Sequence, residues 1–265
     1  GIGSSHQPEL LVDPAHPDEV GAMLKAELVW NEIEGVLEGT PAPNGPLHRV
    51  PGEYATIAAA AASAGPDDVV LVAPGLHEGG VLIGANDVVL RGSAGAASTI
   101  LSAADQGGIV EILAADGDPV RLRGLTLEGG RSDYGAGVRT EDCPLVLDDV
   151  RFLDCEASVD GGAIFGGAAT IPLRDASIED CRSGREGGGI AVDGGALIVR
   201  DAGFRGCESI GGGGAIAITD GSAELDDVTF DRNLGGEGGA VAIRTGSMSS
   251  RNSVFIDNIA STDGG

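Results

Sequence analysis

Four aspartates recur at a fixed spacing and are the best candidates for a metal site in this sequence. Asp149, Asp175, Asp201 and Asp227 lie 26 residues apart, and Asn252 continues the series. If successive copies of a repeat stack as strands, these side chains lie about 5 Å apart and repel one another unless they are solvated, paired or bridged. Ca²⁺ prefers such oxygen ligands. The same residues also suit a sharp bend, because Asp and Asn tolerate the left-handed backbone conformation. Both interpretations remain open.

Three cysteines form a second column with the same spacing. Cys155, Cys181 and Cys207 share a repeat position with Asn233 and Asn258. Stacking predicts a buried ladder of small thiols that replaces an asparagine ladder. Neighbouring Cα atoms would also lie within disulfide range, so a disulfide between two of them is an alternative. The spacings of the four cysteines match no zinc signature.

Residues that typically perform acid–base catalysis give a weaker signal. All four histidines precede the regular repeats, the last of them being His77. The pairs Asp148–Asp149 and Asp226–Asp227 recur with the repeat, whereas a single active site is not expected to recur. One Trp and two Tyr leave little for aromatic sugar-binding platforms. Carboxylate pairs nevertheless permit glycoside hydrolysis, so an enzyme is kept as an alternative.

The elements that must position these columns follow from a repeated phrase. Gly-Gly-Ala-Ile, or a close variant, recurs at steps of 25 or 26 residues, and its last residue is Val138, Ile164, Ile190, Ile216 or Val241. Each repeat contains short runs of alternating apolar residues, such as 145–147, 150–152 and 163–165, separated by Gly, Asp and Asn, which is typical of strands and turns. The glycine doublet that opens the phrase, as at Gly161 and Gly162, is expected to turn the corner into a strand. Three strands in about 26 residues, stacked on identical neighbours, predict a parallel β-helix of roughly eight coils.

The chain divides into three parts. Residues 1–46 do not repeat, and residues 17–39 carry apolar side chains at helical spacing, which predicts an amphipathic helix. Residues 47–124 are expected to contain a short capping helix over Glu53–Ala64 and irregular first coils, because the first coil of a solenoid needs a cap. Regular repeats occupy 125–265, and the array is expected to continue beyond the chain end. Trp30 is a possible anchor for a partner contact.

Composition excludes two classes of partner. Forty-one acidic and 16 basic residues give a formal net charge of −25. Nucleic acid and anionic lipid both need a positive face, so neither is an expected partner. No stretch approaches 18 consecutive apolar residues, and no membrane-spanning segment is expected.

Two groups of residues resemble known β-helix families. The segment from Tyr54 through the alanine run to Gly75 resembles the opening of pectin-lyase-like right-handed parallel β-helix proteins. The repeats resemble those of the polymorphic outer-membrane protein family, marked by Gly-Gly-Ala-Ile and Phe-x-x-Asn, as in Gly161–Ile164, Gly213–Ile216, Gly238–Val241, Phe230–Asn233 and Phe255–Asn258. The resemblance covers about residues 50–265. The chain departs from the second family by placing Cys at the Asn position in three coils.

The resemblance implies an all-β, right-handed β-helix with an N-terminal α-helical cap. It also implies a secreted or cell-surface protein, associated with the bacterial outer membrane and structural or adhesin-like rather than enzymatic. Its expected partner is a protein or glycan at a cell surface, or another copy of itself. Two alternatives remain: a polysaccharide-active lyase or hydrolase, and a subunit of an extracellular filament. No cofactor is expected apart from the possible Ca²⁺.

Overall fold

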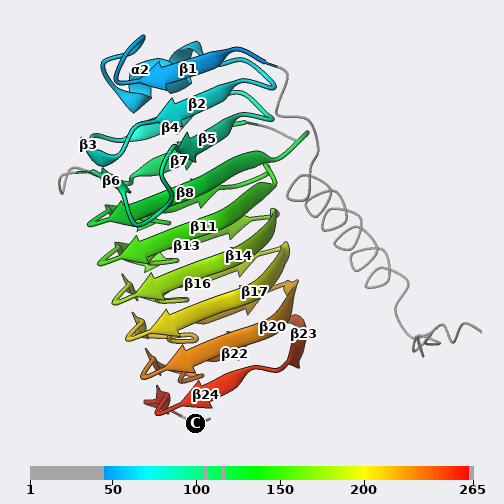
Figure 1. Ribbon diagram of the computed structural model, residues 1–265. Coiled ribbons are helices and arrows are strands. Elements are labelled where there is room, and N and C mark those ends of the chain that lie inside the picture. Colours follow the sequence, from blue (N-terminus) through cyan, green and yellow to red (C-terminus); the bar gives the residue numbers. More distant parts are fainter. Residues whose placement is uncertain (1–44, 104–106, 115–116, 263–265) are drawn as a thin grey trace, which may run out of the picture. The chain divides into compact units, whose positions relative to one another are not determined.

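The chain forms a parallel β-solenoid of about eight coils (Figure 1). The computed structural model describes residues 45–103, 107–114 and 117–262. The predicted right-handed parallel β-helix is confirmed, because every strand pair is parallel and the coils follow one another down the stack. The predicted helix over 17–39 and Trp30 lie outside the described residues, so both stay predictions. So do the boundaries between the three predicted parts.

Three parallel sheets run along the solenoid. Sheet A contains β1 (Leu47–Val50), β2 (Val69–Val72), β5 (Val89–Gly92), β8 (Val120–Glu128), β11 (Leu145–Leu153), β14 (Thr170–Glu179), β17 (Ala196–Arg205), β20 (Gly221–Asp231) and β23 (Gly246–Arg251), with β3 (Gly75–Glu78), β6 (Thr99–Ser102) and β24 (Val254–Ile256). Sheet B contains β4 (Val81–Ile83), β7 (Val110–Ile112), β10 (Val138–Thr140), β13 (Ile164–Gly167), β16 (Ile190–Asp193), β19 (Ile216–Thr219) and β22 (Val241–Ile243). Sheet C contains β9 (Arg131–Tyr134), β12 (Glu156–Asp160), β15 (Arg182–Ser183), β18 (Glu208–Ser209), β21 (Leu234–Gly235) and β25 (Ile259–Ala260).

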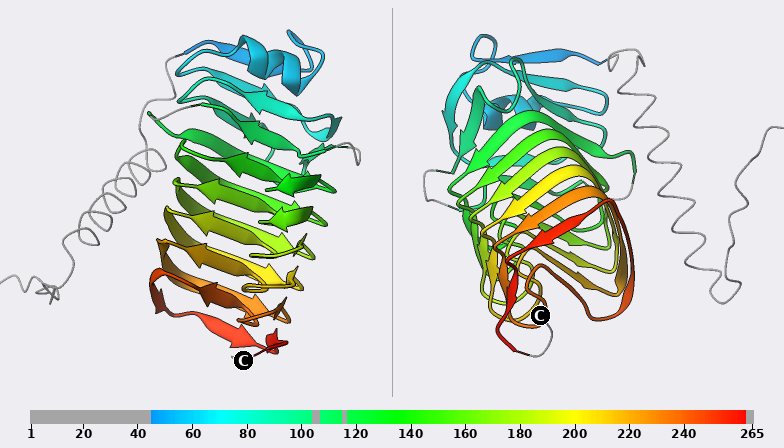
Figure 2. Two further views of the ribbon diagram at one scale, coloured as in Figure 1. Left: turned by 180° about the vertical axis from the view of Figure 1, so that it is seen from behind. Right: turned by 60° about the horizontal axis from the view of Figure 1, so that its bottom comes forward.

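The repeat period sets the register of these sheets. Ile164 pairs with Ile190, and Ile190 pairs with Ile216, so residues one period apart occupy equivalent positions in neighbouring coils. Figure 2 shows the coils nearly superimposed when the stack is tilted toward its axis. A residue's column is therefore fixed by its place in the repeat, and a column can be read from the sequence.

The two glycines that open the repeated phrase have a steric reason. Gly161 adopts φ +66°, a left-handed conformation that strains other residues. A Cβ on Gly162 would lie 2.1 Å from the carbonyl oxygen of Gly188 in the next coil. The chain turns into sheet B at these two positions, and no larger side chain fits there. This confirms the corner role predicted for the doublet.

The strand pattern within a coil differs from the prediction in two respects. The predicted strands at 145–147 and 150–152 form one bent strand, β11, because the bend between them does not interrupt pairing with β8 and β14. Sheet C was not predicted at all, since its strands of two to five residues carry little alternating hydrophobicity. The short strands β1, β3 and β6 were missed for the same reason.

A short helix lies at the N-terminal end of the described stack. Helix α2 (Ile57–Ser63) begins after Thr56, whose side-chain oxygen accepts a hydrogen bond from the backbone nitrogen of Ala59 at 3.2 Å. Its buried face includes Ile57 and Ala60 and packs against β1, β2 and β4 (Figure 1). This helix was predicted over Glu53–Ala64 and is shorter than predicted.

The centre of each coil is filled by a column of large apolar side chains. Phe152, Ile178, Phe204 and Phe230 succeed one another from coil to coil and are almost completely buried. The rings of Phe204 and Phe230 stack with their centroids 5.1 Å apart and an interplanar angle of 15°. This column packs the interior side of sheet A against sheet B.

We expect Phe204→Ala to lower the free energy of unfolding by about 3–5 kcal/mol, because it opens a cavity in a fully buried column. Phe255→Ala is the matched control: this ring also stacks on Phe230, at 4.7 Å, but is 50% exposed. Urea-induced unfolding followed by circular dichroism measures both variants. Equal losses in the two variants would contradict the assignment of the core.

Candidate functional site

The predicted aspartate column forms the bends inside the long strands of sheet A. Asp149, Asp175, Asp201 and Asp227 have φ angles of 49°, 48°, 52° and 54°, and Asn252 follows with 51°. These are the left-handed values that the bend interpretation requires. The column is therefore explained by backbone geometry.

The calcium hypothesis for this column stays a prediction. Over residues 45–103, 107–114 and 117–262, no group of three or more His, Cys, Asp or Glu side chains is arranged to hold a metal ion. Two of the aspartates have protein partners instead. Asp149 Oδ2 accepts a hydrogen bond from the backbone nitrogen of Ala96 at 3.1 Å, and Asp175 Oδ2 lies 3.4 Å from Nε of Arg174.

The cysteine–asparagine column lies in the interior, as the stacking argument predicts. Cys155, Cys181 and Cys207 are fully buried free thiols. The backbone nitrogen of Cys207 donates to Oδ1 of Asn233 at 3.0 Å, and Nδ2 of Asn233 donates to Oδ1 of Asn258 at 2.9 Å. The asparagines thus satisfy backbone and side-chain groups of neighbouring coils.

The ladder thiols suit a structural role. Burial raises the pKa of Cys181 well above its ordinary value and that of Cys207 to about 12. A hydrogen bond with Cys181 lowers the pKa of Cys155, but Cys155 is buried as well. A reactive cysteine needs both an accessible sulfur and a stabilised thiolate, and these residues lack the first.

The structure brings together another set of charged residues, at the corner between sheets C and B. Asp160 is 4% exposed, and its carboxylate is held by the guanidinium of Arg185 from the next coil, with Nε 2.9 Å from Oδ1 and a short second contact from Nη2 to Oδ2. The backbone nitrogen of Glu186 donates to Oδ1 of Asp160 at 3.0 Å. Both oxygens of the Asp160 carboxylate are therefore engaged by donors from the next coil.

Glu186 stands one coil further along the same column in a different environment. It is 6% exposed, and burial raises its pKa above the ordinary value of 4.5. Arg244 Nη2 lies 2.7 Å from Oε1 of Glu186 as an ion pair, but no hydrogen bond from the described residues reaches that oxygen. The same guanidinium also lies 3.1 Å from Oε1 of Glu237, so two carboxyl groups share one cation.

The position of the Glu186 side chain depends on a glycine. Gly212 is the next residue in its column, and a Cβ there would lie 2.0 Å from Oε2 of Glu186 and 3.3 Å from Cβ of Ala217. The carboxyl group therefore occupies the space that a side chain at 212 would fill. Ala191, Ala217 and Ala242 form the adjacent outward column of sheet B, and their small size leaves room beside the carboxyl group.

An aromatic pair continues the corner on the other side of Asp160. Tyr134 pairs with Asp160 across the coils, and its ring lies 5.0 Å from that of Phe165 on sheet B. Arg139, next to Phe165 in the sheet, places its guanidinium carbon 5.8 Å from the centre of the Tyr134 ring. Both rings are half-buried, so each retains an accessible part.

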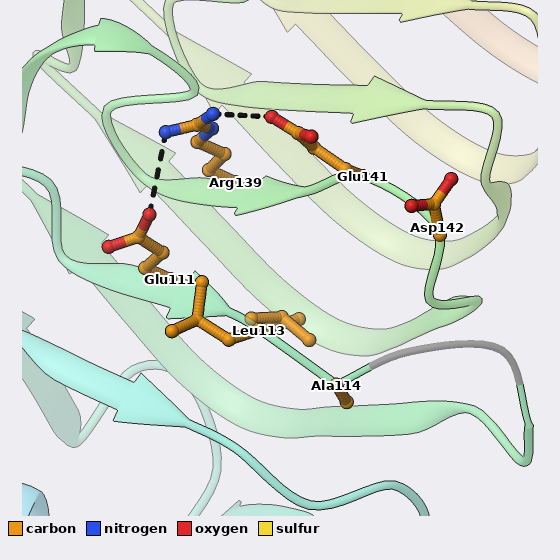
Figure 3. Close-up of a pocket in the computed structure, with 7 residues that line it drawn as sticks. Glu111, Leu113, Ala114, Arg139, Glu141 and Asp142 are labelled. Atoms are coloured by element: carbon orange, nitrogen blue, oxygen red, sulfur yellow. Dashed lines mark hydrogen bonds and ion pairs between the residues drawn. The ribbon is translucent and has the colours of Figure 1, made fainter.

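A shallow hollow of about 240 Å³ lies beyond Arg139 (Figure 3). Glu111 and Glu141 flank the guanidinium of Arg139 and pair with it; Nη1 lies 3.4 Å from Oε1 of Glu111, and Nη2 makes a shorter contact with Glu141. Asp142 follows Glu141 along the rim, and Leu113 contributes an apolar wall.

These residues form one continuous band on the outside of the solenoid, which we call the outer stripe. It consists of Glu111, Tyr134, Arg139, Glu141, Asp142, Asp160, Phe165, Arg185, Glu186, Glu237 and Arg244. It combines an aromatic pair, a buried carboxyl group with a raised pKa (Glu186) and a buried carboxylate paired with a guanidinium (Asp160). Such pairs are typical of acid–base sites.

Sequence reasoning missed the outer stripe because it discounted residues that fall on the repeat. The column Tyr134, Asp160, Glu186, Gly212 and Glu237 keeps the period, but its residue type changes from coil to coil. That change was the available signal, since a purely structural column such as the bend aspartates keeps its type. The predicted metal and ladder residues lie elsewhere and do not join the stripe.

Comparison with known proteins adds information on the fold. No protein-family model matches the chain, and no curated protein matches it significantly. Two crystal structures of the pectin methylesterase from Aspergillus niger are similar to it. The deglycosylated form is 18% identical, covers 85% of this chain and 82% of its own, and has a TM-score of 0.44. A form with an N-acetylglucosamine stub is 16% identical, covers 84% and 88%, and has a TM-score of 0.41.

These neighbours correct the function expected from the sequence. Both are structures of an enzyme, whereas a non-enzymatic structural or adhesin-type protein was expected. It was therefore wrong to prefer a non-enzymatic protein to its alternative, a polysaccharide-active enzyme. The identities are low, so the likeness concerns the fold, and no residue role is transferred from it. Within the described residues, no helix is long and apolar enough to span a membrane.

The bend aspartates provide a test of backbone geometry against calcium binding. We expect Asp201→Ala to lower the free energy of unfolding by about 1–2 kcal/mol, because alanine is strained at φ 52°. Asp201→Asn should keep the stability of the wild type, since asparagine tolerates this conformation. Thermal melting with and without Ca²⁺ measures both variants. A calcium-dependent rise in the wild-type melting temperature that Asp201→Asn abolishes would support the metal hypothesis instead.

The environment of Glu186 has a consequence for stability. The pKa of Glu186 is higher in the folded state than its value of about 4.5 in the unfolded state. The stability that this carboxyl group contributes is therefore fully present below pH 4.5 and is lost as the pH rises through the pKa of the folded state. The melting temperature of Glu186→Gln, relative to wild type, should therefore increase between about pH 4 and pH 7.

Glu208→Gln is the matched control for this measurement. It removes an exposed carboxylate from an ion pair with Arg182 in the neighbouring part of sheet C. Because the side chain of Glu208 is 46% exposed, against 8% for Glu186, its substitution should show no comparable upward trend. A falling difference for Glu186→Gln over the same range would contradict the assigned environment.

Proposed function

We propose that this protein is a polysaccharide-active enzyme, a hydrolase in which Glu186 and Asp160 act as the catalytic carboxyl groups. The observation that carries the proposal is the stacking of two buried carboxyl groups on neighbouring coils in opposite environments. Burial raises the pKa of Glu186 and so favours its protonated form, whereas the carboxylate of Asp160 is paired with the guanidinium of Arg185. Two such groups divide the work of a glycosidase into proton donation and charge stabilisation.

The reaction follows from these two states. Protonated Glu186 donates its proton to the oxygen of the glycosidic bond as the bond to the anomeric carbon breaks. Once the sugar displaces the exposed guanidinium of Arg185, the carboxylate of Asp160 stabilises the positive charge that develops on the sugar ring. Water then adds its hydroxyl group to the anomeric carbon, and the remaining proton returns to Glu186. The net change is the addition of one water molecule to one glycosidic bond.

Arg244 supplies a means of exposing the acid. Its guanidinium covers Glu186 and lowers the pKa of that carboxyl group through its charge, against the effect of burial. Because Arg244 is also paired with Glu237, it retains a partner if a sugar displaces it from Glu186. Its departure would raise the pKa of Glu186 further and favour the proton-donating form.

The flanking parts of the outer stripe suit binding of a sugar chain. The half-buried rings of Tyr134 and Phe165 offer apolar surface to the face of a sugar ring. The hollow beside Arg139 offers carboxylate and guanidinium groups to hydroxyl groups. A linear polymer along the solenoid axis would meet these groups and the acid pair in successive coils.

Two finer statements from the sequence accompany this proposal. We propose an extracellular location, because a polymeric polysaccharide is too large to be taken up before cleavage, and a glycan rather than a protein as the partner. We also propose that the repeats are related to those of the polymorphic outer-membrane protein family and that the protein is associated with that membrane. The Gly-Gly-Ala-Ile and Phe-x-x-Asn phrases, such as Phe230–Asn233, support this.

Release of reducing ends from acidic, neutral and amino-sugar polysaccharides tests the proposed activity. We expect the wild type to cleave at least one class, and Glu186→Gln and Asp160→Asn to reduce the rate by about 100-fold or more, the range for loss of a general acid or a charge-stabilising group. Glu208→Gln, which lies outside the stripe, should retain the wild-type rate.

The pH dependence gives a second readout. The hydrolysis rate should fall at high pH as Glu186 loses its proton. Arg244→Ala should shift this fall in rate to higher pH, because the guanidinium of Arg244 lowers the pKa of Glu186. Turnover that survives in both carboxyl variants would refute the assignment of the catalytic pair. Absence of turnover on all three classes of polymer would refute the activity itself.

A further inference from the structure

We propose that Cys155 and Cys181 form a disulfide as the chain folds in an oxidising environment, and that this bond joins two neighbouring coils of the solenoid. Three observations carry the proposal: the two residues occupy equivalent positions in adjacent coils, their thiols are in contact, and the asparagine ladder of their column is interrupted where they stand. The proposed extracellular location supplies the oxidising environment. The bond itself does not depend on the hydrolase activity.

The backbones of Cys155 and Cys181 are already at a distance that a disulfide spans. The backbone nitrogen of Arg182 donates to the carbonyl oxygen of Cys155 at 2.8 Å, and Glu156 pairs with Arg182 in sheet C. The two cysteines, each directly before one of these residues, are therefore equivalent positions of neighbouring coils. Equivalent residues of parallel strands lie about 4.8 Å apart. The Cα atoms of a disulfide lie about 4.4–6.8 Å apart.

The side chain of Cys181 is directed toward Cys155. Its sulfur is hydrogen-bonded to the backbone nitrogen of Cys155, and the two thiols are hydrogen-bonded to each other, which lowers the pKa of Cys155. Cys207, one coil further along, is engaged by other groups. Its Sγ lies 3.6 Å from the carbonyl oxygen of Ile178, and its backbone nitrogen donates to Oδ1 of Asn233 at 3.0 Å. The contact between thiols therefore favours the pair Cys155 and Cys181.

The asparagines of this column connect their coils through hydrogen bonds that a thiol does not replace. Nδ2 of Asn233 donates to the carbonyl oxygen of Phe204 at 3.1 Å and to Oδ1 of Asn258 at 2.9 Å. A thiol is a weak donor and a weak acceptor, so the coils that carry cysteine lack a side-chain link of comparable strength. A disulfide supplies a covalent link in its place.

The oxidant is an external disulfide of the class of oxidised glutathione. The thiolate of Cys155 attacks one of its sulfur atoms, which breaks the external bond, forms a mixed disulfide and releases one thiolate. The thiolate of Cys181 then attacks the sulfur of Cys155 in the mixed disulfide and releases the second. Two protein thiols are oxidised to one disulfide, and one external disulfide is reduced to two thiols. The protons lost by the cysteines are taken up by the released thiolates.

Burial determines when this exchange takes place. Cys155 and Cys181 are fully buried in the folded protein, so an oxidant reaches their sulfur atoms only while the coils are incomplete. The same burial shields the finished disulfide, because exchange requires access of a thiolate to one of its sulfur atoms. The bond is therefore formed during folding and retained afterwards.

The two coils joined by this bond are those that carry the proposed catalytic pair. Asp160 follows Cys155 by five residues, and Glu186 follows Cys181 by five residues. The disulfide thus lies at the entry to the two segments of sheet C that lead to these carboxyl groups. A covalent link there fixes the spacing between the two segments.

Refolding of the reduced, denatured chain in a buffer of reduced and oxidised glutathione tests the proposal. Remaining thiols are alkylated, and the protein is digested with trypsin without reduction. Cleavage after arginine places the four cysteines on separate peptides, which are residues 140–151, 152–174, 175–182 and 206–232. We expect mass spectrometry to find 152–174 linked to 175–182, with the other two peptides alkylated.

Cys207→Ser is the matched control, because it removes a thiol of the same column and should leave this linkage intact. Cys181→Ser should abolish it and leave Cys155 alkylated. The oxidised wild type should melt about 5–10 °C above its reduced form, and Cys207→Ser should keep this difference whereas Cys181→Ser should lose it.

Alkylation of all four cysteines after refolding would overturn the proposal. A bond between peptides 175–182 and 206–232, or one that uses Cys143, would overturn it as well. None of these results bears on the hydrolase activity, which is tested separately through Glu186 and Asp160.

Discussion

Parallel stacking at one strand spacing is the constraint on which the rest of this structure depends. Each residue stands about 4.8 Å from its equivalent in the next coil, so whatever one coil places at a position must tolerate its neighbour there. Apolar residues meet this condition by burial, as Phe204 and Phe230 do. Asparagines meet it by hydrogen bonding along the column, as Asn233 and Asn258 do. Charged residues meet it only with counter-charges, with bends that point them into water, or with a change of residue type.

The outer stripe follows from the last of these solutions. Two carboxyl groups stacked directly above one another would repel, and Asp160 and Glu186 avoid this in different ways. Asp160 is neutralised by Arg185, and the side chain of Glu186 lies across Gly212 toward Arg244. The difference between the environments of Asp160 and Glu186, on which the proposed acid–base role depends, is thus a consequence of fitting two acids into one column.

The extent to which sequence predicted this molecule follows from the same constraint. The register, the apolar column and the left-handed bends at residues such as Asp201 depend only on the period and on local residue type, so they could be predicted. Sheet C could not, because its short strands are held by the coils on either side rather than by their own pattern. The environment of Glu186 depends on Gly212 and Arg244, which lie 26 and 58 residues further along the chain. Only the folded coil brings them together.

The stripe also shows how a regular solenoid can hold an arrangement of side chains that does not repeat. The period places the same column in every coil, but Arg185, Glu186 and Gly212 occur in an order that no other coil reproduces. Glycine at 212 leaves space for the carboxyl group of Glu186 from the coil before it. Alanine at 217, on the adjacent column of sheet B, leaves space beside that carboxyl group. The site is therefore formed as much by the residues that are small as by those that are charged. A search for conserved chemical groups alone would overlook it, whereas the loss of a side chain from one column of a repeat marks its position.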